Sequence, residues 1–170
     1  HRIDAGEDVV AEATARFSKV LDDAIETKLT DPEKIAACGT SRGGFMAVQF
    51  AAADPRVKAV AAFAPVTDLM ALREFAGAKR RDLVDRLSLK QQAEKLAGRA
   101  VWLIIGDRDD RVSTDESIVF CRAVTAASLK HKKPALVDLH GIAEPQGHTT
   151  PKGAAELAAP WIAAQLGTAK

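Results

Sequence analysis

Hydrophobic residues along the chain form short continuous runs that alternate with longer segments of helical spacing. Three continuous runs are typical of strands in a parallel sheet, and a fourth strand is expected near the carboxyl end; these ranges are 34–39, 57–64, 100–106 and 134–140. Between them, apolar spacing and composition predict helices over 5–29, 45–53, 113–129 and 151–166. Strands and helices alternate without an internal repeat, which predicts an α/β fold with a mostly parallel sheet flanked by helices.

Two details of the pattern refine this prediction. The residues at about 67–96 are heavily charged and carry scattered leucines, which indicates a short helical insertion. Asp4 with Glu7 is expected to begin the first helix as a capping box, and Ser113 with Glu116 is expected to begin another. At 170 residues the chain has the size of one domain, so we expect one catalytic domain spanning 1–170 that contains the insertion.

Charge and composition exclude several classes of protein. The formal net charge is +1, and the two short basic runs lack interleaved aromatic residues, so we expect no nucleic-acid partner. No apolar run has the length that crosses a bilayer, and we expect no membrane partner. Cys38 and Cys121 lack metal-ligand spacing and are expected to be free buried thiols, which slightly favours a cytoplasmic location.

A serine lies between glycines where the first apolar run meets a helical segment. Residues 39–44 read Gly-Thr-Ser-Arg-Gly-Gly, and an apolar segment without proline follows directly. This pattern predicts a strand, a sharp turn and a helix, with Ser41 at the tip of the turn. Glycines are needed beside it because a Cβ there would clash with the neighbouring strand or helix. Ser41 is therefore a candidate nucleophile; a glycine-rich turn with an incidental serine is the alternative.

Acyl transfer by a serine needs a histidine to take its proton and usually a carboxylate to orient that histidine. Asp107, Asp109 and Asp110 all lie in the loop after the third strand, and physical reasoning on the sequence does not choose among them. Surface charge with a helix cap is the alternative interpretation of this acidic loop.

Of the four histidines, His148 has the loop position from which a side chain reaches the serine. His1 is terminal, His131 lies among lysines, and His140 ends a strand as a candidate structural hydrogen bonder. Serine, aspartate and histidine thus follow one another at the carboxyl ends of parallel strands. This is the order found in α/β-hydrolases.

With these motifs the chain resembles the α/β-hydrolase superfamily, and within it the dienelactone hydrolase and prolyl-oligopeptidase-like branch. The matching segments are Asp-Pro-Glu-Lys-Ile at 31–35 with the serine turn at 39–44, Ala-Pro-Val-Thr-Asp at 64–68, Gly106-x-x-Asp109-x-x-Val112, and Gly147-His148. The resemblance implies that Ser41 is the nucleophile, Asp109 the acid and His148 the base, with Asp107 and Asp110 as second choices. It also implies that Asp68 caps a short helix.

The resemblance covers the carboxyl-terminal half of the family's domain. It implies an α/β-hydrolase fold without the N-terminal strands, in which the strand before Ser41 becomes an exposed edge. The Arg42 backbone N–H is expected to give one donor of the oxyanion hole. Family members take the second donor from an early loop, often with a His-Gly-rich motif, which this sequence lacks. We therefore expect a missing N-terminal segment or a partner chain to cover the exposed sheet edge.

These features predict a serine hydrolase that cleaves carboxylic esters or related acyl compounds through an acyl-enzyme, with a small-molecule ester or acyl substrate. No metal and no organic cofactor is expected. The alternatives are a serine peptidase of the same fold and a non-catalytic hydrolase-like fragment that serves as a binding module.

Overall fold

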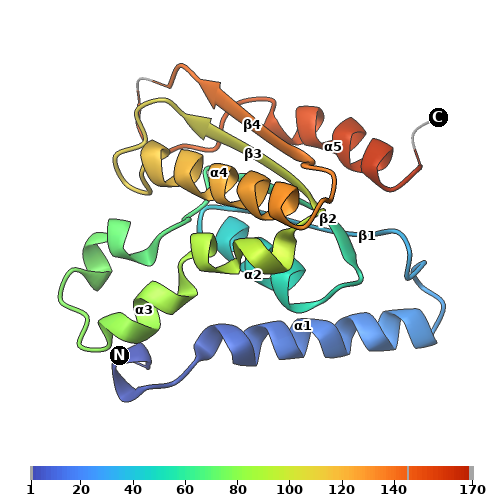
Figure 1. The fold of residues 1–170 in the computed structure, drawn as a ribbon, viewed down its shortest axis with the longest axis horizontal. Coiled ribbons are helices and arrows are strands. Elements are labelled where there is room, and N and C mark those ends of the chain that lie inside the picture. Colours follow the sequence, from blue (N-terminus) through green and yellow to red (C-terminus); the bar gives the residue numbers. More distant parts are fainter. Residues whose placement is uncertain (1, 145, 169–170) are drawn as a thin grey trace.

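The computed structural model describes residues 2–144 and 146–168, which form a parallel sheet between helices (Figure 1). Four strands lie in the order β1-β2-β3-β4: β1 (Ile35–Thr40), β2 (Val57–Phe63), β3 (Ala100–Gly106) and β4 (Val137–Ile142). All three neighbouring pairs are parallel. The predicted α/β class with a parallel sheet is confirmed.

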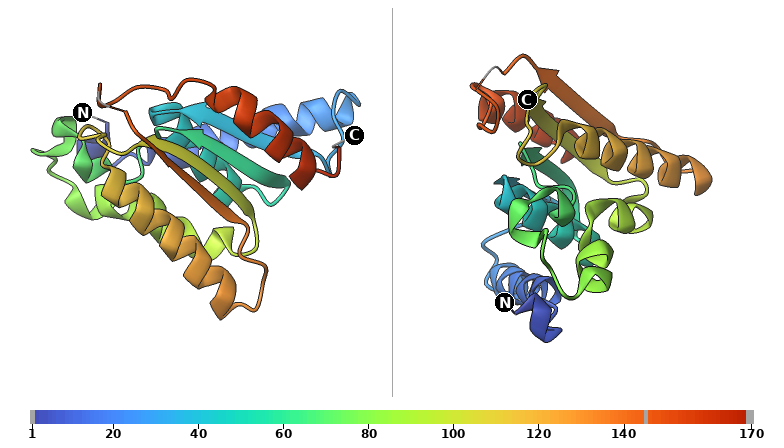
Figure 2. Two further views of the ribbon diagram at one scale, coloured as in Figure 1. Left: turned by 90° about the horizontal axis from the view of Figure 1, so that it is seen from above. Right: turned by 90° about the vertical axis from the view of Figure 1, so that its left-hand side faces the viewer.

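The described residues form five α-helices, of which α2, α4 and α5 pack directly on the sheet. They are α1 (Val9–Glu26), α2 (Arg42–Ala53), α3 (Arg81–Leu87), α4 (Thr114–Lys130) and α5 (Ala154–Gln165). Figure 2 shows α4 and α5 on opposite faces of the sheet. Helix α2 shares the face of α4, and α1 packs on α2, where the Phe17 and Phe50 rings meet edge to face with centroids 5.5 Å apart.

The side chains of β3 alternate between the two faces of the sheet, as its position in a covered sheet requires. Val101, Leu103 and Ile105 join the larger core with α2 and α4. Trp102 and Ile104 face α5, and the Trp102 ring lies 5.8 Å from the Phe63 ring. Every residue of β3 is buried, so this strand fixes the loop that follows it.

The start of the first helix differs from the prediction. Asp8, not Asp4, caps α1, because its carboxylate accepts a hydrogen bond from Ala11 N–H at 2.9 Å. Residues Ile3–Ala5 form a separate 3-10 turn, η1, and the Asp4 carboxylate accepts from Lys79 N–H instead. The predicted cap at Ser113 is confirmed, since its hydroxyl accepts from Glu116 N–H at 3.2 Å.

Three further expectations change at the carboxyl end and at the cysteines. Strand β4 begins at Val137 and runs to Ile142, later than predicted, and α5 begins at Ala154 after a left-handed glycine, not at the Thr-Pro pair. Cys121 is buried, and burial raises the pKa of its thiol to about 12. Cys38 is exposed on β1, so the expectation that both thiols are buried is wrong for it.

The charged segment after β2 forms short helices: η2 (Leu69–Ala71), η3 (Arg73–Phe75), α3 and η4 (Leu89–Leu96). The last of these, η4, packs against α2 and α4. The buried Gln49 side chain of α2 donates to the Leu87 carbonyl at 2.6 Å, which anchors this segment beside the helix that follows Ser41. Within residues 2–144 and 146–168, no helix has the length and apolar character that crossing a membrane requires.

Candidate active site

Ser41 sits at the tip of the turn between β1 and α2, in a backbone conformation that few residues other than glycine adopt. Its φ is 54° and its ψ is −117°. The turn is fixed because Ser41 N–H donates to the Phe63 carbonyl at 2.8 Å, and the Ser41 carbonyl accepts from Val66 N–H at 3.2 Å. Strained geometry of this kind costs on the order of 1–3 kcal/mol and is held only by surrounding structure.

Two glycines make this turn sterically feasible. A Cβ on Gly39 would lie 2.3 Å from the Gly43 carbonyl, and a Cβ on Gly44 would lie 3.0 Å from both the Gly39 carbonyl oxygen and the Pro65 side chain. The predicted reason for glycine, close approach of strand and helix, is confirmed at these two positions. It is wrong for Gly43, because a Cβ there would have no neighbour within 4 Å.

Asp109 is buried in the loop after β3, with no exposed side-chain surface. Its Oδ1 accepts from the Arg111 and Val112 N–H groups, each at 3.1 Å. Its own N–H donates to the Thr114 hydroxyl, which in turn donates to the Gly106 carbonyl at 2.6 Å. These bonds fix the direction of the carboxylate, so Oδ2 is left for another donor.

His148 fills that place from the loop between β4 and α5. Its Nδ1 lies 2.8 Å from Asp109 Oδ2, and its Nε2 lies 3.1 Å from Ser41 Oγ. Because a carboxylate only accepts, the proton of neutral His148 is assigned to Nδ1, which leaves Nε2 to accept from the serine hydroxyl. Gly147, just before it, has a φ of 85°, a left-handed conformation that suits glycine.

The structure therefore brings Ser41, His148 and Asp109 into one chain of hydrogen bonds. The second-choice aspartates do not bond His148. Asp107 Oδ1 accepts from Glu144 N–H at 3.0 Å, and Asp110 lines a cavity that also touches His148. Asp68 caps η2 by accepting from Met70 N–H at 2.8 Å, as expected from the resemblance.

The other histidines do not join this chain of bonds. The His140 ring packs against the Trp102 ring, with 4.9 Å between the ring centroids. The sequence made His140 a candidate structural hydrogen bonder, and the structure gives its side chain this ring contact instead. His131 pairs with Glu94. The placement of His1 lies outside the described residues.

Arg42 follows Ser41 as the first residue of α2, where its N–H has no acceptor within the helix. The N–H is thus available to a negatively charged group placed beside Ser41. No group of three or more His, Cys, Asp or Glu side chains gathers as a metal site in the part of the chain that the structure describes.

Sequence reasoning missed an ion-pair bridge near Ser41, in which Glu74 binds both Arg42 and Arg111. Glu74 Oε1 accepts from Arg42 and from Arg111, each at 2.9 Å, and so joins the turn after Ser41 to the turn after Asp109. The pKa of Glu74 is lowered, first by its own backbone N–H and further by the two arginines. The partners lie far apart in the chain, and no local sequence signal marks them.

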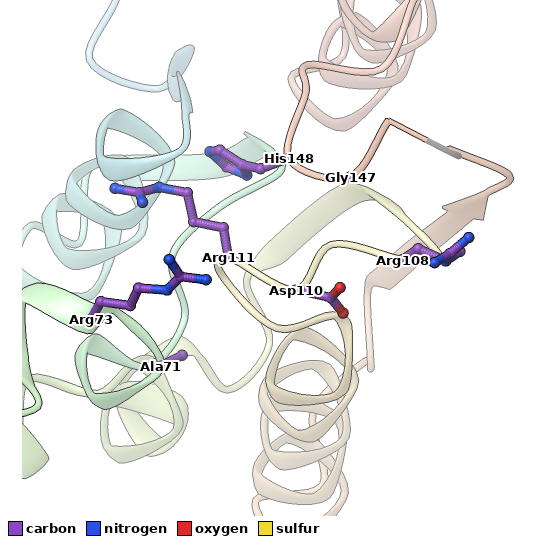
Figure 3. A pocket seen from close by; sticks show the side chains of 7 residues that line it. All are labelled: Ala71, Arg73, Arg108, Asp110, Arg111, Gly147 and His148. Atoms are coloured by element: carbon purple, nitrogen blue, oxygen red, sulfur yellow. The ribbon is translucent and has the colours of Figure 1, made fainter.

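A cavity of about 300 Å³ opens beside His148 (Figure 3). Three arginines, Arg73, Arg108 and Arg111, line it, together with Asp110. Sequence reasoning missed this cavity too, because its arginines come from η3 and from the loop after β3.

A parallel sheet with a serine on a sharp strand-to-helix turn, followed in the chain by an aspartate and a histidine, defines the α/β-hydrolase fold. Within that fold, residues 12–159 match the model of the prolyl oligopeptidase family, and the chain belongs to this family. Curated protein sequences contain no significant match to the chain.

Solved structures show the same fold. A puromycin-hydrolysing peptidase from Mycobacterium tuberculosis is similar over 86% of this chain with a TM-score of 0.69 and 18% identity; the match covers 24% of that protein. A sugar hydrolase from Lactococcus lactis is similar over 93% of this chain and 68% of its own length, with a TM-score of 0.62 and 20% identity. An acetyl xylan esterase from Thermoanaerobacterium is similar over 80% of this chain and 47% of its own, with a TM-score of 0.52 and 18% identity. The chain thus spans about a quarter of the length of the peptidase.

Proposed function

We propose that the protein is a serine hydrolase that cleaves carboxylic esters or related acyl compounds through an acyl-enzyme. The observation that carries this proposal is the continuous chain of hydrogen bonds from Ser41 Oγ through the His148 ring to Asp109. Such a chain is the arrangement that activates a serine hydroxyl, which is otherwise a weak nucleophile.

In the proposed reaction, Ser41 Oγ attacks the substrate carbonyl carbon while His148 Nε2 takes the hydroxyl proton. Asp109 holds His148 in the required tautomer and stabilises the imidazolium that forms. The Arg42 N–H donates to the developing oxyanion, a contribution of about 3 kcal/mol in comparable sites. His148 then gives the proton to the leaving group, and water releases the acyl group from Ser41 by the reverse sequence.

A serine peptidase is the second candidate function. It is favoured by membership of the prolyl oligopeptidase family and by the fold shared with a puromycin-hydrolysing peptidase. The fold shared with an acetyl xylan esterase supports the ester candidate in the same way. The same three side chains would serve both reactions, because amide and ester cleavage pass through similar tetrahedral intermediates.

Hydrolysis of 4-nitrophenyl acetate and of aminoacyl 4-nitroanilides by the purified protein tests both candidates. We expect ester turnover that Ser41→Ala abolishes and that Asp109→Asn lowers by about 10⁴-fold in kcat, because the amide no longer holds the reactive tautomer. Asp107→Asn is the matched control, and its kcat should stay near that of the unchanged protein.

Turnover of the anilide alone would assign a peptidase. Turnover that survives Ser41→Ala would contradict the proposed nucleophile. Absence of any turnover would favour the non-catalytic binding module.

A further inference from the structure

The cavity beside His148 has an unusual charge for a pocket next to a candidate catalytic base. Of the side chains that line it, three are arginines, and Asp110 is the acidic one. The cavity touches His148 itself, so a group bound there lies close to the ring whose Nε2 is 3.1 Å from Ser41 Oγ.

The arginines differ in how far their charge is already neutralised. Arg111 donates to Glu74, but that carboxylate oxygen is shared with Arg42, so one negative charge serves two guanidinium groups. The guanidinium groups of Arg73 and Arg108 have no hydrogen bond or ion pair with any described residue. The cavity wall therefore carries guanidinium N–H donors that have no partner among the described residues, and an excess of positive charge.

The directions of the side chains narrow the position of a ligand. Figure 3 shows the guanidinium groups of Arg73 and Arg111 reaching toward the same part of the cavity, on the side of His148. Arg108 and Asp110 point away from them. A planar guanidinium presents a fork of N–H donors that matches the two oxygens of a carboxylate, so this pair suits a carboxylate better than a neutral group.

We infer that the cavity selects substrates that carry a carboxylate near the scissile bond, with Arg73 as its principal ligand and Arg111 beside it. This inference rests on the proposed hydrolase function and names its substrate class. Because Arg73 and Arg111 are both exposed, we expect the selection to weaken as ionic strength rises.

Two pairs of esters test the inference on the intact protein, one with the charge on the acyl side and one with it on the leaving group. The first pair is mono(4-nitrophenyl) glutarate and 4-nitrophenyl butyrate; the second is 4-acetoxybenzoate and 4-acetoxybenzamide. In at least one pair we expect the ratio of kcat/KM, charged over neutral, to fall roughly tenfold in Arg73→Gln, the scale of one charge-assisted hydrogen bond.

Arg122→Gln is the matched control, since Arg122 is an exposed arginine of α4 away from the cavity. It makes the same change in net charge and should leave both ratios unchanged. Ratios that are equal in the unchanged protein and in Arg73→Gln for both pairs would overturn the inference, while turnover of the neutral esters would leave the hydrolase proposal intact.

Calorimetric titration with glutarate gives a readout that needs no turnover. We expect glutarate to bind the unchanged protein and Arg122→Gln alike and to bind Arg73→Gln roughly tenfold more weakly. Equal binding to all three proteins, or no binding to any, would overturn the inference even if no ester is hydrolysed.

Discussion

Ser41 adopts a left-handed backbone conformation that the surrounding residues must hold in place. Its φ of 54° is tolerated because Phe63 and Val66 bond its backbone from the next strand and loop. Gly39 lets the helix approach, since a Cβ there would lie 2.3 Å from the Gly43 carbonyl. Stability and reactivity thus depend on the same few backbone atoms.

Gly39→Ala should destabilise the protein by about 1–3 kcal/mol or more, because the added methyl group overlaps backbone that has no room to move. Gly43→Ala is a matched control: a Cβ at Gly43 has no neighbour within 4 Å, and alanine favours helix by about 1 kcal/mol. Urea unfolding of the two variants checks the difference. Equal stabilities would mean that strand and helix do not approach so closely.

At the residue scale the sequence carries local signals well and distant contacts poorly. The glycine spacing around Ser41 predicts the turn, because the steric demand is local. Physical reasoning did not separate Asp109 from Asp107 and Asp110, since burial and the backbone donors of Arg111 and Val112 arise only in the folded loop. Neither Glu74 nor Arg73 has a sequence signal, because their partners and neighbours are brought together by the fold.

Asp54 and Arg56, in the turn between α2 and β2, connect these two elements to α1. The Asp54 carboxylate accepts from the Arg56 guanidinium at 2.6 Å and from the Ser18 hydroxyl of α1 at 2.8 Å. Arg56 also donates to Asp22 of α1. The hydrogen bonds from Arg56 are the main cause that lowers the pKa of Asp54 to about 2.

Because the folded pKa lies below that of an unfolded aspartate, about 3.9, this carboxylate stabilises the protein at neutral pH. Asp54→Asn should lower the free energy of unfolding by about 1–2 kcal/mol at neutral pH. The difference from the unchanged protein should disappear as the pH falls from about 4 through about 2, where folded Asp54 takes up its proton.

Denaturant titrations over this pH range check the prediction. Asp23→Asn, which alters an exposed α1 carboxylate, is the control and should change stability little. A loss in Asp54→Asn that persists unchanged at low pH would contradict an electrostatic origin.

Element types were predicted better than element ends. Strands and helices follow from apolar runs and spacing, which local chemistry sets. The predicted start of α1 was wrong because Asp4 and Asp8 both have side chains that can cap a helix. The Asp4 carboxylate accepts from Lys79 N–H, 75 residues away, and Asp8 caps the helix. The α5 start depends on the left-handed Gly153, which the Thr-Pro signal does not reveal.

At the scale of the whole molecule, β1 is an edge strand of the described sheet, as the resemblance implied. Ala37 faces the larger core, so Cys38, the next residue, faces the opposite side of the sheet. Helix α5 packs against β2 and β3 on that side. Cover of this edge by an N-terminal segment or a partner chain stays a prediction.

Thiol labelling tests that prediction. In the isolated 170-residue chain, N-ethylmaleimide should modify exposed Cys38 and spare Cys121, whose burial keeps the thiol protonated, until the protein unfolds. Slower labelling of Cys38 in the protein purified from its source is the result expected if further polypeptide covers the edge. Equal labelling of Cys38 in the two preparations would contradict such cover.

The most direct test of the proposed catalytic serine is intact-mass spectrometry after incubation with a fluorophosphonate probe. This reagent modifies a serine that a neighbouring histidine activates. We predict one adduct on the unchanged protein and none on Ser41→Ala, with both proteins equally folded by circular dichroism. No adduct on the folded, unchanged protein, or an adduct that persists in Ser41→Ala, would contradict activation of Ser41 by His148.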